Sequence, residues 1–151
     1  MKTYKLNDLN NPLISVLMPA YNAEKYIKEA IESILNQTFS NFEFIIIDDG
    51  SIDATEEIIK SFKDSRIVYI KNEKNLGLIK TLNKGISIAR GEFIARMDSD
   101  DISMPQRFEL QLDVFKKYKG VDIVNVALKK MSEDGTKLSK YRHNIYPGFE
   151  A

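Results

Sequence analysis

Two clusters of aspartates, each directly after an apolar run, are the side chains with the clearest potential for chemistry in this sequence. The first cluster contains Asp48, Asp49 and Asp53, and the second contains Asp98, Asp100 and Asp101. Carboxylates that lie close together raise each other's pKa and cost stability unless a cation compensates them. Hard oxygen ligands suit Mg²⁺ or Mn²⁺, which keep coordination positions for substrate phosphates. The two clusters therefore predict a metal site that binds a ligand carrying a diphosphate.

The elements that must position these aspartates alternate along the chain between short apolar strands and amphipathic helices. We expect strands at residues 13–18, 42–47, 67–70, 93–97 and 121–128, and a returning strand at 138–143 after a turn at 134–135. Helical stripes separate the first five strands; Asn22 is the expected N-cap of the first helix, and Asp53 with Glu56 forms a capping box at the second. This alternation indicates an α/β domain with a largely parallel sheet and helices on both faces.

The placement of the aspartates relative to the predicted strands strengthens the metal hypothesis. Ligands of open α/β sheets bind at the carboxyl ends of the strands, near the point where the strand order switches. Both clusters follow strands, so we expect them at one crevice. An Asp-x-Asp triplet by itself is also common in surface loops, and Asp53 is equally explained as a helix cap.

Composition excludes several other classes of function. The net charge is zero, so no global field favours nucleic acid, and the absence of cysteine excludes disulfides and thiolate chemistry. The polar N-terminus lacks the apolar core of a signal peptide, and no apolar run approaches the roughly 18 residues of a transmembrane helix. We expect a cytoplasmic protein, with peripheral attachment to the inner face of the membrane left open.

Two familiar phosphate-binding motifs are missing. Neither a Gly-x-Gly-x-x-Gly fingerprint nor a Gly-x-x-x-x-Gly-Lys loop follows the first predicted strand, where the sequence instead runs Pro19-Ala20-Tyr21-Asn22. This disfavours a dinucleotide-binding Rossmann domain. It also disfavours a sugar-phosphate nucleotidyltransferase, which would carry a glycine-rich loop here. Phosphate recognition is therefore expected to depend on the metal.

Several ordered motifs together resemble the family-two glycosyltransferases of the GT-A fold, over roughly residues 13–122. The matching segments are ISVLMPAYN (14–22), SILNQTF (33–39), FEFIIIDDGS (42–51), NLG (75–77) and GEFIARMDSDD (91–101), followed by Pro105 and Arg107. The form of the last segment is similar to the branch of the family that builds bacterial capsule, exopolysaccharide or lipopolysaccharide chains. The resemblance implies a Rossmann-like GT-A domain that transfers a sugar, with inversion, from a nucleotide diphosphate donor to a saccharide or lipid-linked acceptor.

The resemblance also implies a role for particular residues on the nucleoside side of the site. Pro19 and Tyr21 would line the uridine pocket, although Tyr21 is equally explained as a packing residue. Asp49 would accept a hydrogen bond from the base, which suits the ring N–H of uracil and favours a UDP-sugar. Asp48 would contact the nucleoside or would only end the strand.

The remaining implied roles concern the diphosphate and the metal. Asp98 would lie near the ribose and the metal, and Asp100 would coordinate the Mn²⁺ or Mg²⁺ that bridges the diphosphate. Lys80 would reach the phosphates or the sugar of the donor, with a surface charge as the alternative. Asp101 is expected to cap the turn that follows.

The sequence departs from the family pattern in its length, because family members usually continue for many tens of residues beyond the Asp-x-Asp triplet. We expect one domain over residues 1–151, with a nucleotide-sugar-binding core at 13–128 and the start of the acceptor-side region, a hairpin, at 129–151. The resemblance implies that most of the acceptor-side part, with the carboxylate that acts as general base, lies beyond Ala151. The alternative to an active transferase is a truncated, non-catalytic module that binds the nucleotide-sugar.

Overall fold

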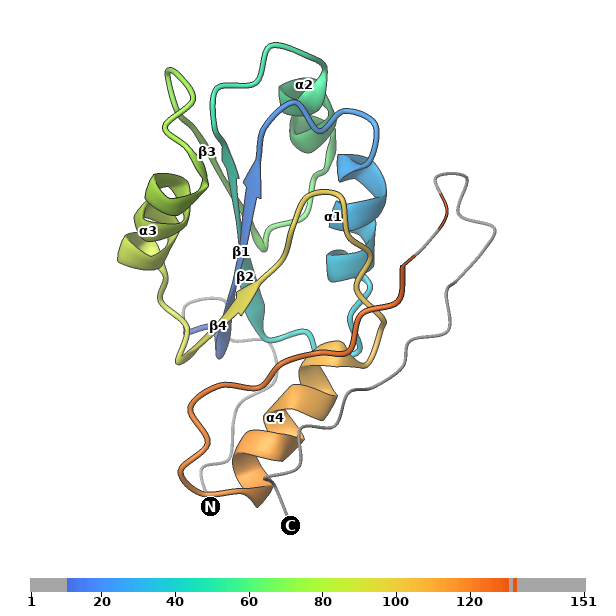
Figure 1. Ribbon diagram of the computed structural model, residues 1–151, viewed down its shortest axis with the longest axis vertical. Coiled ribbons are helices and arrows are strands. Elements are labelled where there is room, and N and C mark those ends of the chain that lie inside the picture. Colours follow the sequence, from blue (N-terminus) through green and yellow to red (C-terminus); the bar gives the residue numbers. More distant parts are fainter. Residues whose placement is uncertain (1–10, 131, 133–151) are drawn as a thin grey trace. The chain divides into compact units, whose positions relative to one another are not determined.

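The computed structural model describes residues 11–130 and 132. Strands and helices alternate strictly along this part of the chain (Figure 1). The elements are β1 (Ile14–Ala20), α1 (Ile27–Leu35), β2 (Phe42–Asp48), α2 (Thr55–Ser61), β3 (Ile67–Lys71), α3 (Leu78–Ile88), β4 (Phe93–Arg96) and α4 (Arg107–Lys117). The chain divides into two compact units between residues 110 and 111, so α4 begins in the first and continues into the second.

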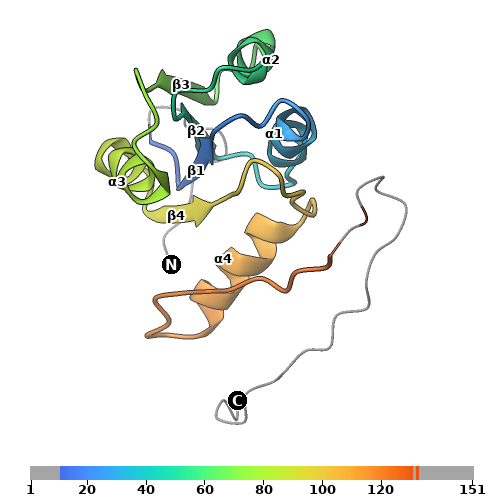
Figure 2. The same cartoon turned by 45° about the horizontal axis from the view of Figure 1, so that its top comes forward.

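The four strands form one parallel sheet in the order β3-β2-β1-β4. Helices α1 and α2 cover one face of this sheet, and α3 covers the other (Figure 2). A strand between two helical layers is buried on both faces, which favours an unbroken apolar run over alternation. Every residue of β2 is buried, as its sequence predicted. The predicted α/β class with a parallel sheet is therefore confirmed.

Helices on the two opposite faces of the sheet complete the hydrophobic core of the first unit. The stripe of α1 predicted from its spacing is buried against the sheet, with Ile27, Ile31 and Ile34 completely inaccessible to solvent. On the opposite face, α3 packs Leu82 onto a cluster formed by Leu17, Ile45 and Ile47. Gly85 makes this approach close: a Cβ there would lie 3.2 Å from Ile47 Cδ1. The glycine that weakens α3 as an isolated helix thus lets it lie tightly on the sheet.

A buried polar network fixes the entry of β4 beside β1. Glu43 Oε1 accepts hydrogen bonds from Ser15 Oγ (2.6 Å) and from the Arg90 backbone N–H (2.7 Å), and Arg90 Nε donates to Oε2 (2.9 Å). Gly91 N donates to Ser15 Oγ (2.8 Å), and a Cβ at Gly91 would lie only 2.5 Å from Ser15 N. Burial raises the pKa of Glu43, but these hydrogen bonds outweigh it and hold the pKa below its ordinary value. The network sets where β4, and therefore the second aspartate cluster, enters the sheet.

Three sequence predictions about local structure are wrong. Residues 121–128 form no strand, although their apolar pattern favours one; Val124 O instead accepts a hydrogen bond from the Gln111 side chain (3.0 Å). Asn22 does not cap α1, which begins at Ile27. Glu56 takes no part in a capping box at α2, because its carboxylate pairs with two lysines. The predicted turn at 134–135 and the strand at 138–143 lie outside the described residues.

Candidate active site at the carboxyl end of the sheet

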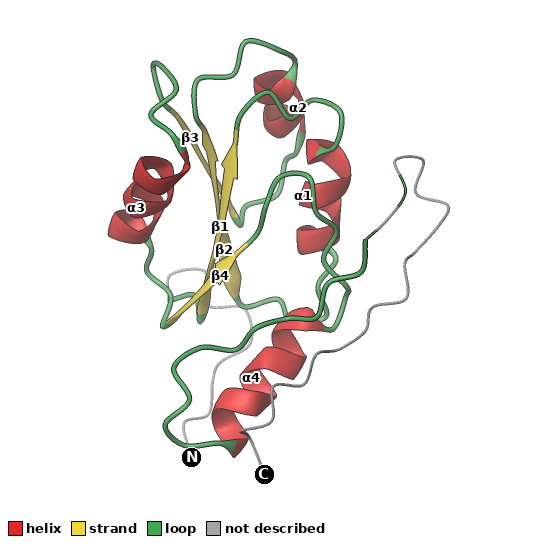
Figure 3. Ribbon diagram, in the orientation of Figure 1, coloured by secondary structure: helices red, strands yellow, loops and turns green. Residues whose placement is uncertain are grey.

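The carboxyl ends of all four strands meet at one edge of the sheet, where the loops to the following helices begin (Figure 3). The strand order switches at β1, because β2 and β3 lie on one side of it and β4 on the other. Asp49 N donates to Ala20 O (2.8 Å), and Met97 N donates to Leu17 O (2.9 Å). The two aspartate clusters therefore flank the end of β1. They follow strands on either side of β1, and neighbouring strands lie about 5 Å apart, at the edge where such folds bind ligands.

Asp48 is completely buried at the end of β2. Its Oδ1 accepts a hydrogen bond from Ser51 N (2.8 Å), and its Oδ2 accepts one from the Tyr69 hydroxyl (3.3 Å). Lys71 Nζ lies 3.8 Å from the same oxygen. Burial and the negative charge of Asp48 raise the pKa of Tyr69, so this phenol stays protonated and acts as a donor. The carboxylate of Asp48 thus stabilises the turn that follows β2.

Asp49, by contrast, organises the loop between β3 and α3. Its Oδ1 accepts hydrogen bonds from Asn72 Nδ2 (2.7 Å) and Leu76 N (3.0 Å), and its Oδ2 accepts one from Gly77 N (2.9 Å). Burial raises the pKa of Asp49, but these donors outweigh it and hold the pKa below its ordinary value. The carboxylate is therefore ionised at neutral pH and forms the anchor of this loop.

Gly50 allows the same loop to pass directly over the end of β2. Its φ is +79°, in the left-handed region, and a Cβ there would lie 2.7 Å from the backbone carbonyl carbon of Lys74 and 2.9 Å from Asn75 N. No side chain fits such a gap without moving the backbone. Asp49 and Gly50 together therefore form the platform on which residues 72–77 lie.

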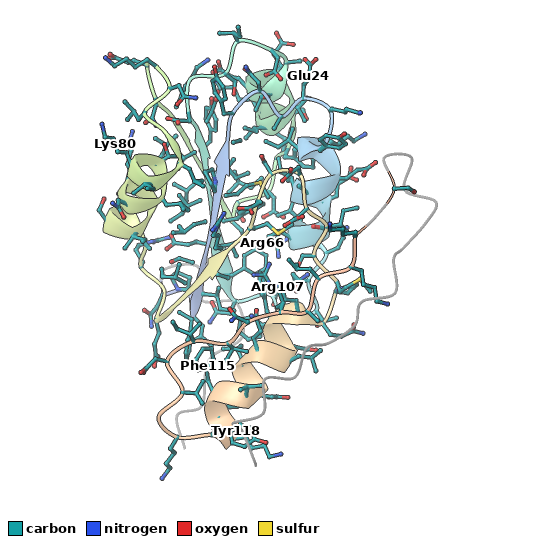
Figure 4. All side chains as sticks on the ribbon, in the orientation of Figure 1. Glu24, Arg66, Lys80, Arg107, Phe115 and Tyr118 are labelled. Atoms are coloured by element: carbon teal, nitrogen blue, oxygen red, sulfur yellow. The ribbon has the colours of Figure 1, made fainter. Side chains whose placement is uncertain are left out.

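The loop after β1 is joined to the loop after β2 by hydrogen bonds in both directions. Asn22 N donates to Ser51 Oγ (3.0 Å), and Asn22 Oδ1 accepts from Ile52 N (3.0 Å). Glu24 N donates to Asp53 Oδ2 (3.1 Å), while Glu24 Oε2 accepts from Ala54 N (2.9 Å), beside the start of α2 (Figure 4). These bonds explain why Asn22 is not a helix cap: its side chain holds the neighbouring loop instead.

Pro19 and Tyr21, the residues predicted to line a uridine pocket, lie at the end of β1 and directly after it. Pro19 pairs in register with Ile47 but lies two residues beyond the last β4 pairing, at Leu17 and Arg96, so its missing N–H costs no ladder bond on that side. Tyr21 is half exposed.

The second aspartate cluster is more open to solvent. Arg96 Nε donates to Asp98 Oδ1 (3.0 Å) and Arg96 Nη2 donates to Oδ2 (3.2 Å), so the guanidinium grips both carboxylate oxygens. Asp100 is exposed and makes no hydrogen bond or ion pair with any residue in the described part of the chain. Partial desolvation and the charges of Asp100 and Asp98 raise the pKa of Asp101. The cluster therefore carries repulsion that a cation would relieve.

The segment that follows this cluster is held by the end of α1. The buried amide of Gln37 donates through Nε2 to Ser103 Oγ (3.1 Å) and Met104 O (2.8 Å), and its Oε1 accepts from Phe108 N (3.2 Å). Arg107 Nη2 donates to Arg96 O (2.8 Å), which ties the start of α4 to the end of β4 (Figure 4). The motif around Gln37 thus positions the acidic loop from outside the sheet.

Lys80 lies on the exposed surface of α3, on the side away from the sheet (Figure 4). No hydrogen bond or ion pair joins it to the other predicted site residues that the structure describes. The fold therefore brings Asp48, Asp49, Pro19 and Tyr21 together around the end of β1 and β2, and Asp98 with Asp100 beyond β4. Lys80 is not part of either group.

The acidic loop fits a divalent metal only in part. Asp98 and Asp100 supply hard carboxylate oxygens, the donors that Mg²⁺ and Mn²⁺ prefer. Among the described residues, however, no three or more candidate ligands converge on one point. A two-carboxylate site suits a metal that completes its shell with water and substrate phosphates, and it does not suit a closed, all-protein cage.

Sequence reasoning missed Asn72 and Lys84, which support the Asp49 carboxylate from β3 and α3. Lys84 Nζ donates to Asn72 Oδ1 (2.6 Å), and Asn72 Nδ2 donates in turn to Asp49. A polar residue directly after a predicted strand was the signal available for Asn72. Lys84 gave no signal, because a lysine on an amphipathic helix is normally a solvated charge.

Comparison with known proteins places this fold in a class. The first 349 residues of Staphylococcus aureus TarS, solved with UDP-GlcNAc, superpose with a TM-score of 0.66 and 30% identity, over 76% of this chain and 37% of that one. A Pyrobaculum calidifontis mannosyltransferase has the same fold, with a TM-score of 0.56 and 23% identity over 61% of this chain and 28% of that one. The domain is thus a GT-A-type α/β domain, as its sequence predicted.

The sequence comparisons then identify the family. Residues 15–150 match the model of the glycosyl transferase family 2, and the chain belongs to this family of enzymes. An uncharacterized glycosyltransferase of Methanocaldococcus jannaschii is 42% identical over 93% of the chain and 50% of its own length. The Escherichia coli glucosyltransferase WfgD, named for transfer from UDP-Glc to α-D-GlcNAc-diphosphoundecaprenol, is 37% identical over 78% of the chain and 49% of its own length. The chain thus spans about half the length of these curated relatives.

No helix in the described part of the chain has the length and hydrophobicity needed to cross a membrane.

Proposed function

We propose that this chain forms the donor half of a glycosyltransferase that uses a UDP-sugar and a divalent metal in the synthesis of a cell-surface polysaccharide. The observation that carries the proposal is the position of the two aspartate clusters on either side of the end of β1. One cluster is buried and organises loops, which suits recognition of the nucleoside. The other is exposed and repulsive, which suits a metal and a diphosphate.

Relatives support the choice of donor. The solved TarS domain, at 30% identity, binds UDP and UDP-GlcNAc, and the name of WfgD states a UDP-Glc donor and a lipid-linked acceptor. On this proposal Pro19 and Tyr21 line the uridine pocket, and Asp48 keeps the loop beneath it in place. Asp49 accepts the ring N–H of uracil, while Lys80 reaches the donor only through its own flexible side chain.

The exposed cluster holds the diphosphate end of the donor. Asp98 and Asp100 would bind Mn²⁺ or Mg²⁺, and Asp98 would release Arg96 in doing so, which frees a guanidinium for the phosphates. When bound, the metal would stabilise the charge that develops on the departing nucleotide diphosphate. The acceptor hydroxyl then attacks the anomeric carbon with inversion, after a carboxylate outside the described residues removes its proton. The acceptor is a saccharide or a lipid-linked acceptor.

Two variants test this division of labour by calorimetric titration. Asp100→Ala should abolish the dependence of UDP affinity on Mn²⁺, because it removes the exposed carboxylate. Asp49→Ala should weaken the binding of UDP more than the binding of inorganic pyrophosphate, because Asp49 contacts the nucleobase. Glu32→Ala, an exposed acid on α1, is the matched control and should change neither affinity. A UDP affinity in Asp100→Ala that still responds to Mn²⁺ would contradict the metal assignment. Equal losses of affinity for UDP and pyrophosphate in Asp49→Ala would contradict the role of Asp49 in binding the nucleobase.

A further inference from the structure

Asn72, just after β3, has a side chain whose polar atoms are all engaged, although only 3% of the residue is exposed. Its Nδ2 donates to Asp49 Oδ1 (2.7 Å) and to Thr81 Oγ1 (3.4 Å), and its Oδ1 accepts from Lys84 Nζ (2.6 Å). An ammonium group only donates and an ionised carboxylate only accepts, so these partners allow the amide one orientation. Asn72 is therefore a fixed bridge between two opposite charges.

This bridge makes Lys84 the counter-charge of Asp49, although the two side chains belong to different elements. The ammonium group comes from α3, the amide follows β3 and the carboxylate follows β2. Hydrogen bonds in a buried chain polarise one another, and a missing partner leaves a buried polar group unsatisfied. Loss of the Lys84 donor would leave Asn72 Oδ1 without the partner that sets its orientation. The hydrogen bond from Asn72 to Asp49 would then weaken.

The same network determines how the Asp49 carboxylate is held toward a ligand. Oδ1 receives two donors, Asn72 Nδ2 and Leu76 N. Oδ2 receives Gly77 N, which it shares with Asn75 Oδ1 (both 2.9 Å), and the Thr81 hydroxyl is a further donor to the carboxylate. An ionised carboxylate only accepts hydrogen bonds, so these donors fix the orientation in which it meets a nucleobase N–H.

We propose that Lys84 is a positioning residue for the donor site: through Asn72 it holds the Asp49 carboxylate in the orientation in which it meets the ring N–H of the nucleobase. This inference rests on the proposed function, because it takes Asp49 as the residue that binds the base. Lys84 itself touches neither base nor phosphate. Its effect is transmitted entirely through one buried amide.

The test compares Lys84→Met with Lys84→Arg and with Lys28→Met, an exposed lysine on α1 that serves as control. Methionine keeps the length of the side chain and favours the helix but cannot donate. Loss of a hydrogen bond that supports a charged group predicts a UDP affinity about tenfold weaker in Lys84→Met, with unchanged affinity for pyrophosphate. Lys84→Arg should recover part of the UDP affinity, and Lys28→Met should keep all of it.

A second measurement needs no ligand. In the free chain, NMR hydrogen exchange at the amides of Leu76 and Gly77 should be faster in Lys84→Met than in the unaltered chain or in Lys28→Met, with α1 amides unchanged. Faster exchange with unaltered UDP affinity would overturn the role at the donor site, and unaltered exchange would overturn the positioning role itself. If the unaltered chain binds no UDP, the proposed function fails together with the base contact. The exchange rates then decide separately whether Lys84 holds the loop.

Discussion

Substitution of Gly50 by alanine should displace the loop of residues 72–77 from the end of β2 and destabilise the fold. The added Cβ would lie 2.7 Å from the carbonyl carbon of Lys74, whereas ordinary van der Waals contact begins at 3.4 Å. Both atoms belong to rigid backbone, so the loop must move away. Leu76 N is 3.0 Å from Asp49 Oδ1, and a displacement of roughly 0.5–1 Å takes such a pair to the limit of a hydrogen bond or beyond it.

The cost has two parts. The left-handed φ of +79° costs about 1–2 kcal/mol for any residue with a Cβ. Loss of a hydrogen bond to the buried carboxylate adds about 1.5–3 kcal/mol. We therefore expect Gly50→Ala to lose about 2.5–5 kcal/mol of unfolding free energy, which lowers the Tm by about 10 °C or more for a unit of this size.

Thermal denaturation followed by circular dichroism measures the total loss, and Gly77→Ala separates its two parts. Gly77 also has a positive φ, +88°, but nothing lies within 4 Å of its Cβ position. It should lose only backbone strain, about 1–3 kcal/mol, because its ψ of 154° places it in a region that is populated essentially by glycine alone. Equal losses of stability in the two variants, with the Leu76 amide still protected from exchange in Gly50→Ala, would refute the steric argument.

Two further predictions concern the contacts that position the acidic loop. Glu43→Gln should cost about 1–3 kcal/mol at neutral pH, because the amide replaces a charged acceptor of Ser15 and Arg90. The folded pKa of Glu43 lies below its unfolded value, so its contribution to stability is present above the ordinary pKa of 4.5 and is lost as the pH falls through the folded pKa. Urea denaturation across this range should therefore show a flatter acid limb in Glu43→Gln than in the unaltered chain, and identical limbs would contradict the assignment. Gln37→Leu should cost about 2–4 kcal/mol, because it leaves buried groups of the 103–108 segment unsatisfied. Substitution of its exposed neighbour, Asn36→Ala, should cost little stability. A similar loss of stability in both variants would count against the role of Gln37 in holding the 103–108 segment.

Local pattern was enough to predict the strands and helices of the first unit. The unbroken apolar run of β2 indicated a strand buried on both faces, and the spacing on α1 indicated its buried stripe; both are confirmed. These features depend only on which residues leave water together. Proximity of the aspartate clusters followed from a general rule about parallel sheets, and the observed strand order supplies the switch point that this rule requires.

The sequence was less informative wherever a partner far along the chain decides the outcome. Asn22 has the composition of a helix cap, yet its partner is Ile52, thirty residues away. Residues 121–128 have the pattern of a strand, but a strand also needs a neighbour with which to form a ladder, and propensity does not supply one. Asn72 and Lys84 join the site only because β3 and α3 converge behind Asp49.

The most direct test of the account is calorimetric titration of this chain with UDP, with and without Mn²⁺, and with GDP as the competitor nucleotide. The account predicts binding that is selective for UDP and that strengthens when Mn²⁺ is present. Binding of neither nucleotide, or equal binding of both without any response to Mn²⁺, would contradict a UDP-sugar donor site built from the two aspartate clusters.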